Sequence, residues 1–352
     1  MAPTAPAFGQ IVPPNESWLA RAEPEKALDP DLPIVDAHLH FWHMPDSAPY
    51  FADDYAADVE KSGHRVDATV FVECRTMYRT TGPEHLRSVG ETEFAVGMAA
   101  IGASNRYLRT NAASAIVGQV DLTQGARAVE ALEAHIESAN GRFRGVRHRA
   151  KWDPDPVVRG RESALMQGVL RTPEFSEGLD ALTRLGLSFD ASVFHPQIPD
   201  VTALARAHPD ARIILNHSGS PIGHASYRGK QKEVHETWLA GMKELAACEN
   251  VHVKLGGVLL HLANLDYLQA PAPPSSKELA ELWRPYIEPC IELFGPARCM
   301  VESNFPVDKA GFSYGTVMNM FKRILAPYSR AEKTSVLSGT ARRVYRIESH
   351  CE

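Results

Sequence analysis

The stretch LPIVDAHLH, residues 32–40, is a short apolar run that ends in two histidines. Seven more runs rich in apolar or β-branched residues follow it, at residues 67–73, 114–122, 142–150, 187–195, 211–219, 250–257 and 298–306. Such nearly continuous apolar runs are typical of parallel strands that are buried on both faces. They recur roughly every 38 residues, a spacing that accommodates one strand, one helix and their loops.

Segments with helical periodicity lie between these runs. Apolar residues recur at i, i+3, i+4 and i+7, and a glycine ends the segment, at residues 52–63, 123–141, 173–186 and 276–295. An open doubly wound sheet normally has a glycine-rich first turn, whereas the first run here ends in His-Leu-His. The sequence therefore predicts an α/β protein, a closed (β/α)8 TIM barrel over residues 32–346. We expect a proline-rich, extended N-terminal arm over residues 1–31 and a short tail over residues 347–352.

The composition is that of an ordinary globular protein. Of the 352 residues, 44% are hydrophobic and 23% are charged, and the net charge of −6 argues against binding to nucleic-acid phosphates. No apolar run reaches the roughly 18 residues of a membrane span, and the N-terminus lacks the pattern of a secretory signal. The five cysteines form no CxxC pair, which argues against a zinc ribbon or a disulfide framework. We therefore expect a cytoplasmic protein that acts on a small molecule and binds neither nucleic acid nor membrane.

Histidines gather at the predicted functional rim. In a TIM barrel the functional residues lie at the carboxyl ends of the strands. His38 and His40 are two residues apart on one strand, so both should point to one face, where two imidazoles can bind a divalent cation. His195 and His217 end two later, neighbouring strands. Each histidine could instead be structural, but their shared rim favours a functional site, and the chain has 15 histidines from which ligands could come.

The candidate substrate-binding residues at this rim are basic or aromatic: Trp42, Arg75, Tyr78, Arg147, His148, Lys254 and Phe305. Arg147 shares strand parity with Arg149, so it is a plausible fork for a carboxylate. Lys254 interrupts an apolar run and is expected either to pair with an acid such as Glu302 or to contact substrate, because an unpaired buried lysine is costly. The aromatic side chains could stack on a substrate ring or simply pack in the core.

Several of these motifs together resemble a known family. In chain order they are DAHLHFW, FRGVRH, the histidine that ends the fifth run, LNHSGSP, VKLGG and CMVESNFPVDK. The set resembles the amidohydrolase superfamily, specifically its amidohydrolase-2 branch of sugar lactonases, pyrone-dicarboxylate lactonase and metal-dependent aromatic-acid decarboxylases. The resemblance covers residues 32–346 and implies a TIM-barrel hydrolase.

The resemblance also implies roles for individual residues. Where a metal is present in the family, it is held by residues that match His38, His40, His195 and the position of Asn304. The residue that matches His217 orients water or polarises the scissile group. We therefore expect at most one divalent metal, zinc or manganese, with metal-free catalysis as the alternative.

The chain departs from the family at the last strand. Members of the branch often have GSDWP where residues 302–306 read ESNFP, and the amide of Asn304 cannot serve as a general base. Either Glu302 supplies the missing carboxylate, or the site works with weak or no metal binding, or His217 or Asp308 is the base.

Three functions remain open at this stage. The first is a hydrolase that opens a lactone or related cyclic ester of a carboxylated small molecule. The second is a metal-dependent decarboxylase of an aromatic or hydroxy acid, against which Asn304 counts. The third is a barrel that binds a metabolite without catalysis, against which the retained histidines count.

The proline-rich arm and the PAPPSS segment, residues 271–276, could serve a homo-oligomer interface.

Overall fold

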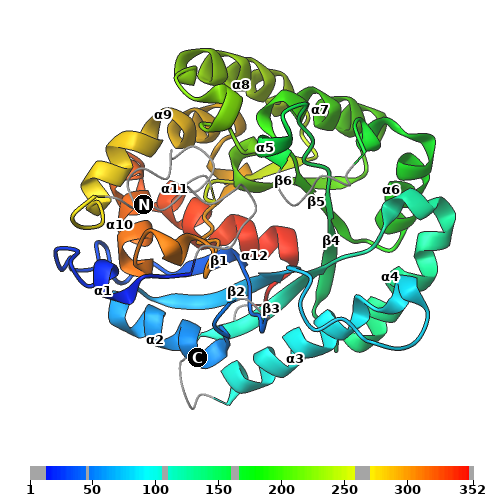
Figure 1. Cartoon of the computed structure of the whole chain (residues 1–352), viewed down its shortest axis with the longest axis horizontal. Helices are drawn as coiled ribbons and strands as arrows, with labels where there is room; N and C mark the ends of the chain where they lie inside the picture. The colour runs from blue at the N-terminus through cyan, green and yellow to red at the C-terminus, as the bar shows by residue number, and fades with distance from the viewer. Residues whose placement is uncertain (1–12, 45–46, 105–109, 160–165, 258–269, 349–352) are drawn as a thin grey trace.

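The protein is a barrel of eight parallel strands. The computed structural model describes residues 13–44, 47–104, 110–159, 166–257 and 270–348. Its strands pair in chain order from first to last, which confirms the predicted TIM barrel (Figure 1). The strands are β1 (Ile34–Leu39), β2 (Val66–Val72), β3 (Asn111–Gly118), β4 (Phe143–Arg149), β5 (Ser188–Ser192), β6 (Arg212–Leu215), β7 (Val251–Lys254) and β8 (Cys299–Met300).

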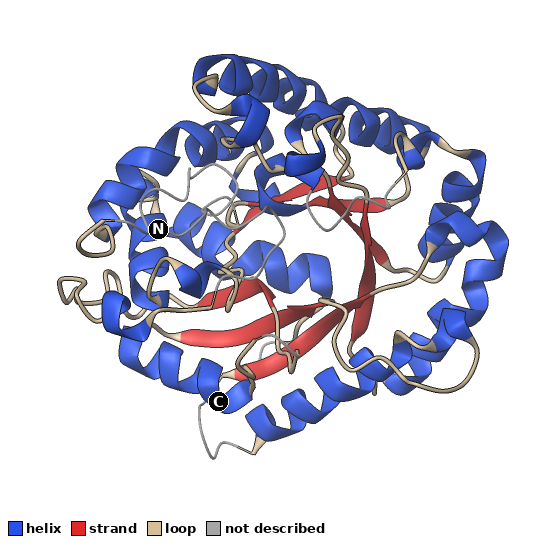
Figure 2. Ribbon diagram, in the orientation of Figure 1, coloured by secondary structure: helices blue, strands red, loops and turns tan. Residues whose placement is uncertain are grey.

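The helices lie mostly on the outside of the barrel (Figure 2). They are α1 (Glu16–Leu19), α2 (Ala52–Ser62), α3 (Val89–Ala103), α4 (Ala128–Ser138), α5 (Pro156–Arg159), α6 (Pro173–Arg184), α7 (Ile198–Ala207), α8 (Gln231–Ala246), α9 (Ser276–Phe294), α10 (Tyr314–Ile324), α11 (Arg330–Thr334) and α12 (Thr340–Tyr345). The four helical segments predicted from periodicity are confirmed, except that residues 123–127 of the second form a 3-10 turn with a non-helical Gly125, and the α-helix begins at Ala128. Gly63 and Gly186 follow α2 and α6 with φ of 68° and 69°, a left-handed conformation that favours glycine at the end of a helix.

The barrel closes through residues that follow the short β8. The backbone amide of Ala37 donates to the carbonyl of Val301 at 3.1 Å, and that of His40 donates to the carbonyl of Phe305 at 2.7 Å. The amide of Asn304 donates to the carbonyl of His38 at 2.9 Å. The seam therefore places the β8 exit directly beside the two histidines of the first strand.

The last helix, α12, fills the amino-terminal end of the barrel. Figure 1 shows it within the ring of strands. Its apolar side chains form one buried cluster with Ile347 and with apolar side chains of the strands: Val35, Ala37, Ala68, Val70, Val72, Ala115, Val117, Ile214, Met300, Ala341, Val344, Tyr345 and Ile347. This apolar plug leaves the polar residues of the strands at the opposite, carboxyl-terminal end.

The N-terminal arm is not wholly extended, contrary to the sequence prediction. Residues 16–19 form the helical turn α1, which is capped by the side chain of Asn15. Trp18 is buried, and its indole N–H donates to the carbonyl of Ala270 at 2.8 Å. This burial outweighs the disruptive effect of the flanking prolines, whereas residues 1–12 of the arm lie outside the described part.

Among the helices described, none combines the length and apolar character that a membrane crossing requires.

Candidate active site

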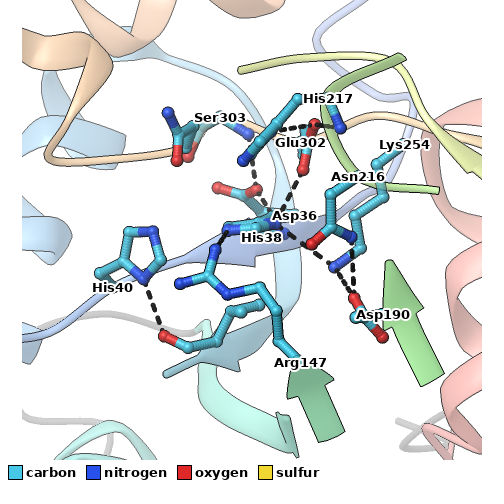
Figure 3. Close-up of polar contacts among 12 residues, drawn as sticks. Asp36, His38, His40, Arg147, Asp190, Asn216, His217, Lys254, Glu302 and Ser303 are labelled. Carbon is cyan, nitrogen blue, oxygen red and sulfur yellow. Dashed lines mark hydrogen bonds and ion pairs between the residues drawn. The ribbon is translucent and has the colours of Figure 1, made fainter. Parts of the chain in front are cut away.

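His38 lies at the centre of a buried polar cluster at the carboxyl ends of the strands (Figure 3). Its Nδ1 is 2.9 Å from Oε2 of Glu302, and its Nε2 is 3.2 Å from Nη1 of Arg147. Oε1 of Glu302 is in turn 2.8 Å from Nδ1 of His217. Four different strands or strand exits thus bring together three groups that the sequence had singled out around His38.

A register shift in β1 decides which side chains reach this cluster. The pairing of β1 with β2 shifts between Asp36 and Leu39. Asp36 consequently faces the helix layer, where its Oδ2 accepts from the hydroxyls of Tyr55 and Tyr314 at 3.4 and 3.2 Å. Burial raises the pKa of Asp36 to about 6. His38 faces the barrel interior instead, so the simple alternation expected for the end of this strand does not hold.

The partners of His38 and His217 fix their protonation. A guanidinium only donates, so Nε2 of His38 accepts from Arg147, and the proton of the neutral ring is on Nδ1, facing Glu302. Burial lowers the pKa of His38 and of His217 well below the usual value, and for His38 the charge of Lys254 adds to the effect. Both rings are therefore neutral near pH 7.

Glu302 is the shared partner of the two histidines. Its Oε1 accepts from the backbone amide of His217 at 3.1 Å as well as facing the ring. Burial raises the pKa of Glu302 to about 8, against the opposing effects of the Lys254 charge and of backbone hydrogen bonds. The raised pKa means that one proton is bound here below about pH 8. Because the carboxyl contacts a neutral imidazole, this extra proton belongs to the Glu302–His217 pair rather than to one residue. The pair can therefore take up or release one proton near pH 8.

Lys254 pairs with an acid, but not with the one the sequence suggested. Its Nζ is 2.7 Å from Oδ2 of Asp190 and 3.4 Å from Nδ1 of His38. Asp190 also accepts from Nδ2 of Asn216 at 3.0 Å and from the hydroxyl of Tyr345 at 3.0 Å. The partner is thus Asp190 in place of the expected Glu302, and the sequence analysis did not single out Asp190. The signal in the sequence was the charge of Asp190 inside the otherwise apolar fifth run, residues 187–195.

Two arginines of β4, which share strand parity, bind one carboxylate of the protein itself, that of Glu73, whereas the sequence suggested Arg147 as a fork for a substrate carboxylate. Nε of Arg147 is 2.7 Å from Oε1 of Glu73, and Nε of Arg149 is 2.9 Å from the same oxygen. Although burial opposes it, these two charges hold the pKa of Glu73 well below its usual range. Glu73 therefore stays ionised and keeps the guanidinium of Arg147 beside His38.

His40 and His195 lie in the same region but contact other groups. The His40 and His38 rings are 4.9 Å apart, and Nδ1 of His40 donates to the carbonyl of Val72 at 2.7 Å. The ring of His195 packs edge-on against Tyr227 at 5.4 Å, and its Nδ1 has no hydrogen-bond partner among the residues described. Burial lowers the pKa of His40 to about 3 and that of His195 to about 4. Both rings are neutral and able to act as ligands.

The sequence comparison identifies the family. The model of the amidohydrolase family matches residues 35–347. The chain belongs to the amidohydrolase family. The resemblance drawn from the motifs is thereby confirmed, and with it a hydrolase as the class of enzyme.

Individual relatives of this amidohydrolase span nearly its whole length. It is 29% identical to an uncharacterised protein of Sinorhizobium fredii, over 90% of this chain and 99% of that protein. It is 27% identical to an L-fucono-1,5-lactonase of Burkholderia ambifaria, over 89% of this chain and 96% of that enzyme. A crystal structure of an amidohydrolase from Burkholderia multivorans with bound zinc matches with a TM-score of 0.69 and 24% identity, covering 90% of this chain and 99% of that one.

The amidohydrolase has a donor set that fits a divalent cation. Ligand atoms of His38, His217 and Glu302 all lie within 4.8 Å of one another. Within the described residues, Oε2 of Glu302 is buried and receives no well-aligned hydrogen bond, so it has lone pairs to offer. Two imidazoles and a carboxylate suit zinc or manganese. This set differs from the expected one, because His40 and His195 are not part of the group found among the described residues.

Asn304 does not lie on a strand. Because β8 ends at Met300, Glu302 and Asn304 do not share a strand face. Asn304 has φ of 55°, and its Nδ2 donates to Oδ1 of Asp308 at 2.8 Å. Burial raises the pKa of Asp308 well above its usual value, which keeps this acid neutral and makes it a hydrogen-bond partner of the amide rather than a ready base.

The other candidate substrate contacts fall into two groups, some lining cavities and others buried in the protein. Arg75 and His148 line a cavity of about 420 Å³ over the ends of β2 to β4, and Tyr78 lines a neighbouring cavity of about 620 Å³. Trp42 is buried and stacks 6.3 Å from the ring of His40. Phe305 has no exposed surface and packs edge-on against Tyr314, so its ring belongs to the wall that supports the site.

Proposed function

We propose that this amidohydrolase opens a lactone ring by the attack of water, with the Glu302–His217 pair as the general base. The observation that carries the proposal is the pair of contacts between Oε1 of Glu302 and the ring and backbone nitrogens of His217, 2.8 and 3.1 Å long. They fix the imidazole with Nδ1 toward the carboxylate and Nε2 on the opposite side. A carboxylate that orients a neutral histidine in this way is a recurrent device for activating a nucleophile.

The proton of the attacking water is passed through this pair. With Glu302 ionised, the ring proton of His217 is on Nδ1, and Nε2 is basic. As the water oxygen bonds to the lactone carbonyl carbon, Nε2 takes the water proton. When the ring C–O bond breaks, the same proton passes to the leaving alkoxide oxygen, and the product is the open hydroxy acid.

Arg147 supplies the positive charge for the carbonyl oxygen. Its guanidinium is held by Glu73 and is only 6% exposed, so the charge is fixed in position and poorly screened. Preorganised charge of this kind stabilises the negative oxygen that develops during attack. The carboxylated or polyhydroxylated part of a lactone would then extend toward Arg75, Arg149 and His148.

The relatives support a lactone as the substrate class. The match to an L-fucono-1,5-lactonase covers almost the full length of both chains. A zinc or manganese ion held by His38, His217 and Glu302 would polarise the carbonyl and lower the pKa of water. The same donor atoms form the proton pair, so cation and proton compete for them.

The test is an assay of the hydrolysis of L-fucono-1,5-lactone, other sugar lactones and aromatic lactones, in which the release of acid is measured. Protein purified without chelator is compared with chelated protein and with protein reloaded with zinc or manganese. We expect turnover that is lost in His217→Asn and kept in His85→Asn, a variant of an exposed histidine. No lactone turnover under any metal condition would contradict the proposal. Release of CO2 from hydroxy-aromatic acids in its place would indicate the decarboxylase.

A further inference from the structure

The turn that follows β2 is held in an unusual conformation beside the active site. Arg75 and Met77 have φ of 65° and 51°, in the left-handed region that non-glycine residues rarely adopt. Such conformations persist only where surrounding contacts enforce them, and they cluster at functional sites. The turn begins at Glu73, the carboxylate that binds both arginines of β4.

A buried carboxyl group from the first turn of α3 holds this turn in place. Oε1 of Glu91 accepts from the backbone amides of Cys74 at 2.7 Å and Thr76 at 3.1 Å, which flank the left-handed Arg75. Glu91 is only 1% exposed. Its neighbour Gly90 allows the close approach, because a Cβ there would lie 2.5 Å from the carbonyl oxygen of Met77.

The same turn is fastened to the exit of β1. The hydroxyl of Thr76 accepts from the amide of His43 and donates to its carbonyl, both at 3.2 Å. The thiol of Cys74 contacts the carbonyl of Phe41 at 3.5 Å. The position of the turn is therefore coupled to the strand that carries His38 and His40, as well as to the arginines of β4.

We propose that Glu91 is a positioning residue of the active site: its carboxyl group holds the turn at residues 74–76 and thereby sets Glu73 and its two arginines against His38. Glu91 touches none of the groups assigned to the reaction. It acts through Glu73 and Arg147. The kinetic part of its test rests on the proposed lactone hydrolysis.

The charges of the two acids are consistent with this arrangement. Burial and the negative charge of Glu73 raise the pKa of Glu91 to about 8, whereas the two arginines keep Glu73 ionised. One acid is neutral and the other charged near pH 7, so their proximity creates no net repulsion. Oε2 of Glu91 has no hydrogen-bond partner among the residues described, so an amide nitrogen can replace it while Oε1 is kept.

The first test does not depend on activity. The labelling rate of each cysteine by a thiol reagent is measured by peptide mapping in the full-length protein. We expect Glu91→Ala to speed labelling of Cys74 about tenfold or more through local opening, with Cys248, Cys290 and Cys299 unchanged as internal controls. Glu91→Gln, which keeps Oε1, and Glu133→Ala, at an exposed site on α4, should label like the native protein.

The second test measures lactone hydrolysis by the same variants. We expect Glu91→Ala to lower kcat/KM about tenfold to a hundredfold through misplacement of the arginines, and Glu91→Gln to restore it.

Glu91→Asp, whose shorter side chain cannot reach both amides, serves if the alanine variant fails to fold and should open Cys74 selectively. Equal acceleration of labelling at Cys74, Cys248, Cys290 and Cys299, or an unchanged rate at Cys74, would overturn the proposal. Selective opening at Cys74 with unchanged kcat/KM would overturn it too. If the native protein hydrolyses no lactone, the labelling result alone decides whether the turn is held as proposed, and only the lactonase assignment fails.

Discussion

One oxygen of Glu302 accepts two hydrogen bonds from His217, one from Nδ1 at 2.8 Å and one from the backbone amide at 3.1 Å. The backbone of His217 has φ of 54°, so the turn after β6 is bent to bring both nitrogens to the same acceptor. The arrangement fixes the ring in two places. It also makes the carboxyl and the imidazole a single proton-binding unit.

The activity should increase with pH. The general base exists only after the Glu302–His217 pair has lost its extra proton, and burial raises the pKa of Glu302 to about 8. We expect kcat/KM for lactone hydrolysis to rise about tenfold per pH unit below this value and to level off above it. The measurement is initial rates from about pH 6 to 9.5, corrected for spontaneous hydrolysis. A rate that falls between pH 6 and 8 would exclude this pair as the base.

Replacing the acid should change both activity and the pH dependence of stability. Glu302→Gln should lower kcat about 10²- to 10⁴-fold, because a neutral amide cannot stabilise the positive charge that His217 gains when it takes the water proton. In the native protein the folded-state pKa lies above the unfolded value, so the protonated carboxyl contributes stability that is complete below about pH 4.5 and is lost as pH rises through about 8. The free energy of unfolding of the variant, measured with urea, should therefore fall less between about pH 5 and about pH 8 than that of the native protein. Parallel slopes for the two proteins would contradict the raised pKa.

The barrel itself was predictable from the sequence because it depends on local patterns. Continuous apolar runs, helical periodicity and terminal glycines each report one strand or one helix. Parallel strands of a barrel also have a defined functional end, so His38, His217 and Arg147 could be placed at one rim. Their proximity follows from the fold rather than from any single motif.

The details of the site depend on contacts that local patterns do not report. The register shift within β1 turns Asp36 away from His38, and β8 already ends at Met300, before the left-handed Asn304. The partner of Lys254 is Asp190, from a strand two positions away in the sheet. Such pairs are set by the three-dimensional curvature of the barrel, which strand parity alone cannot give.

The buried ion pair should matter to folding when it is broken on one side. Lys254 and Asp190 are both fully buried, 2.7 Å apart. Lys254→Met leaves the carboxylate of Asp190 buried without its cation, and we expect a loss of about 3–5 kcal/mol in the free energy of unfolding. The double variant Lys254→Met, Asp190→Asn should recover most of that loss. Urea unfolding at pH 7 measures both, and additive losses in the double variant would show that the two residues do not depend on each other.

The glycine beside His217 should be essential for the orientation of the ring. Gly257 has φ of 63°, and a Cβ there would lie 1.8 Å from Nδ1 of His217, so Gly257→Ala must displace the imidazole from Glu302. We expect a loss of about 10²-fold in kcat and about 1–3 kcal/mol in stability. Gly229→Ala is the matched control: Gly229 has φ of 78° but nothing within 4 Å of the added methyl. It should cost about 1 kcal/mol of stability through backbone strain alone and leave kcat unchanged. If both variants keep full activity, the position of the His217 ring does not govern the reaction.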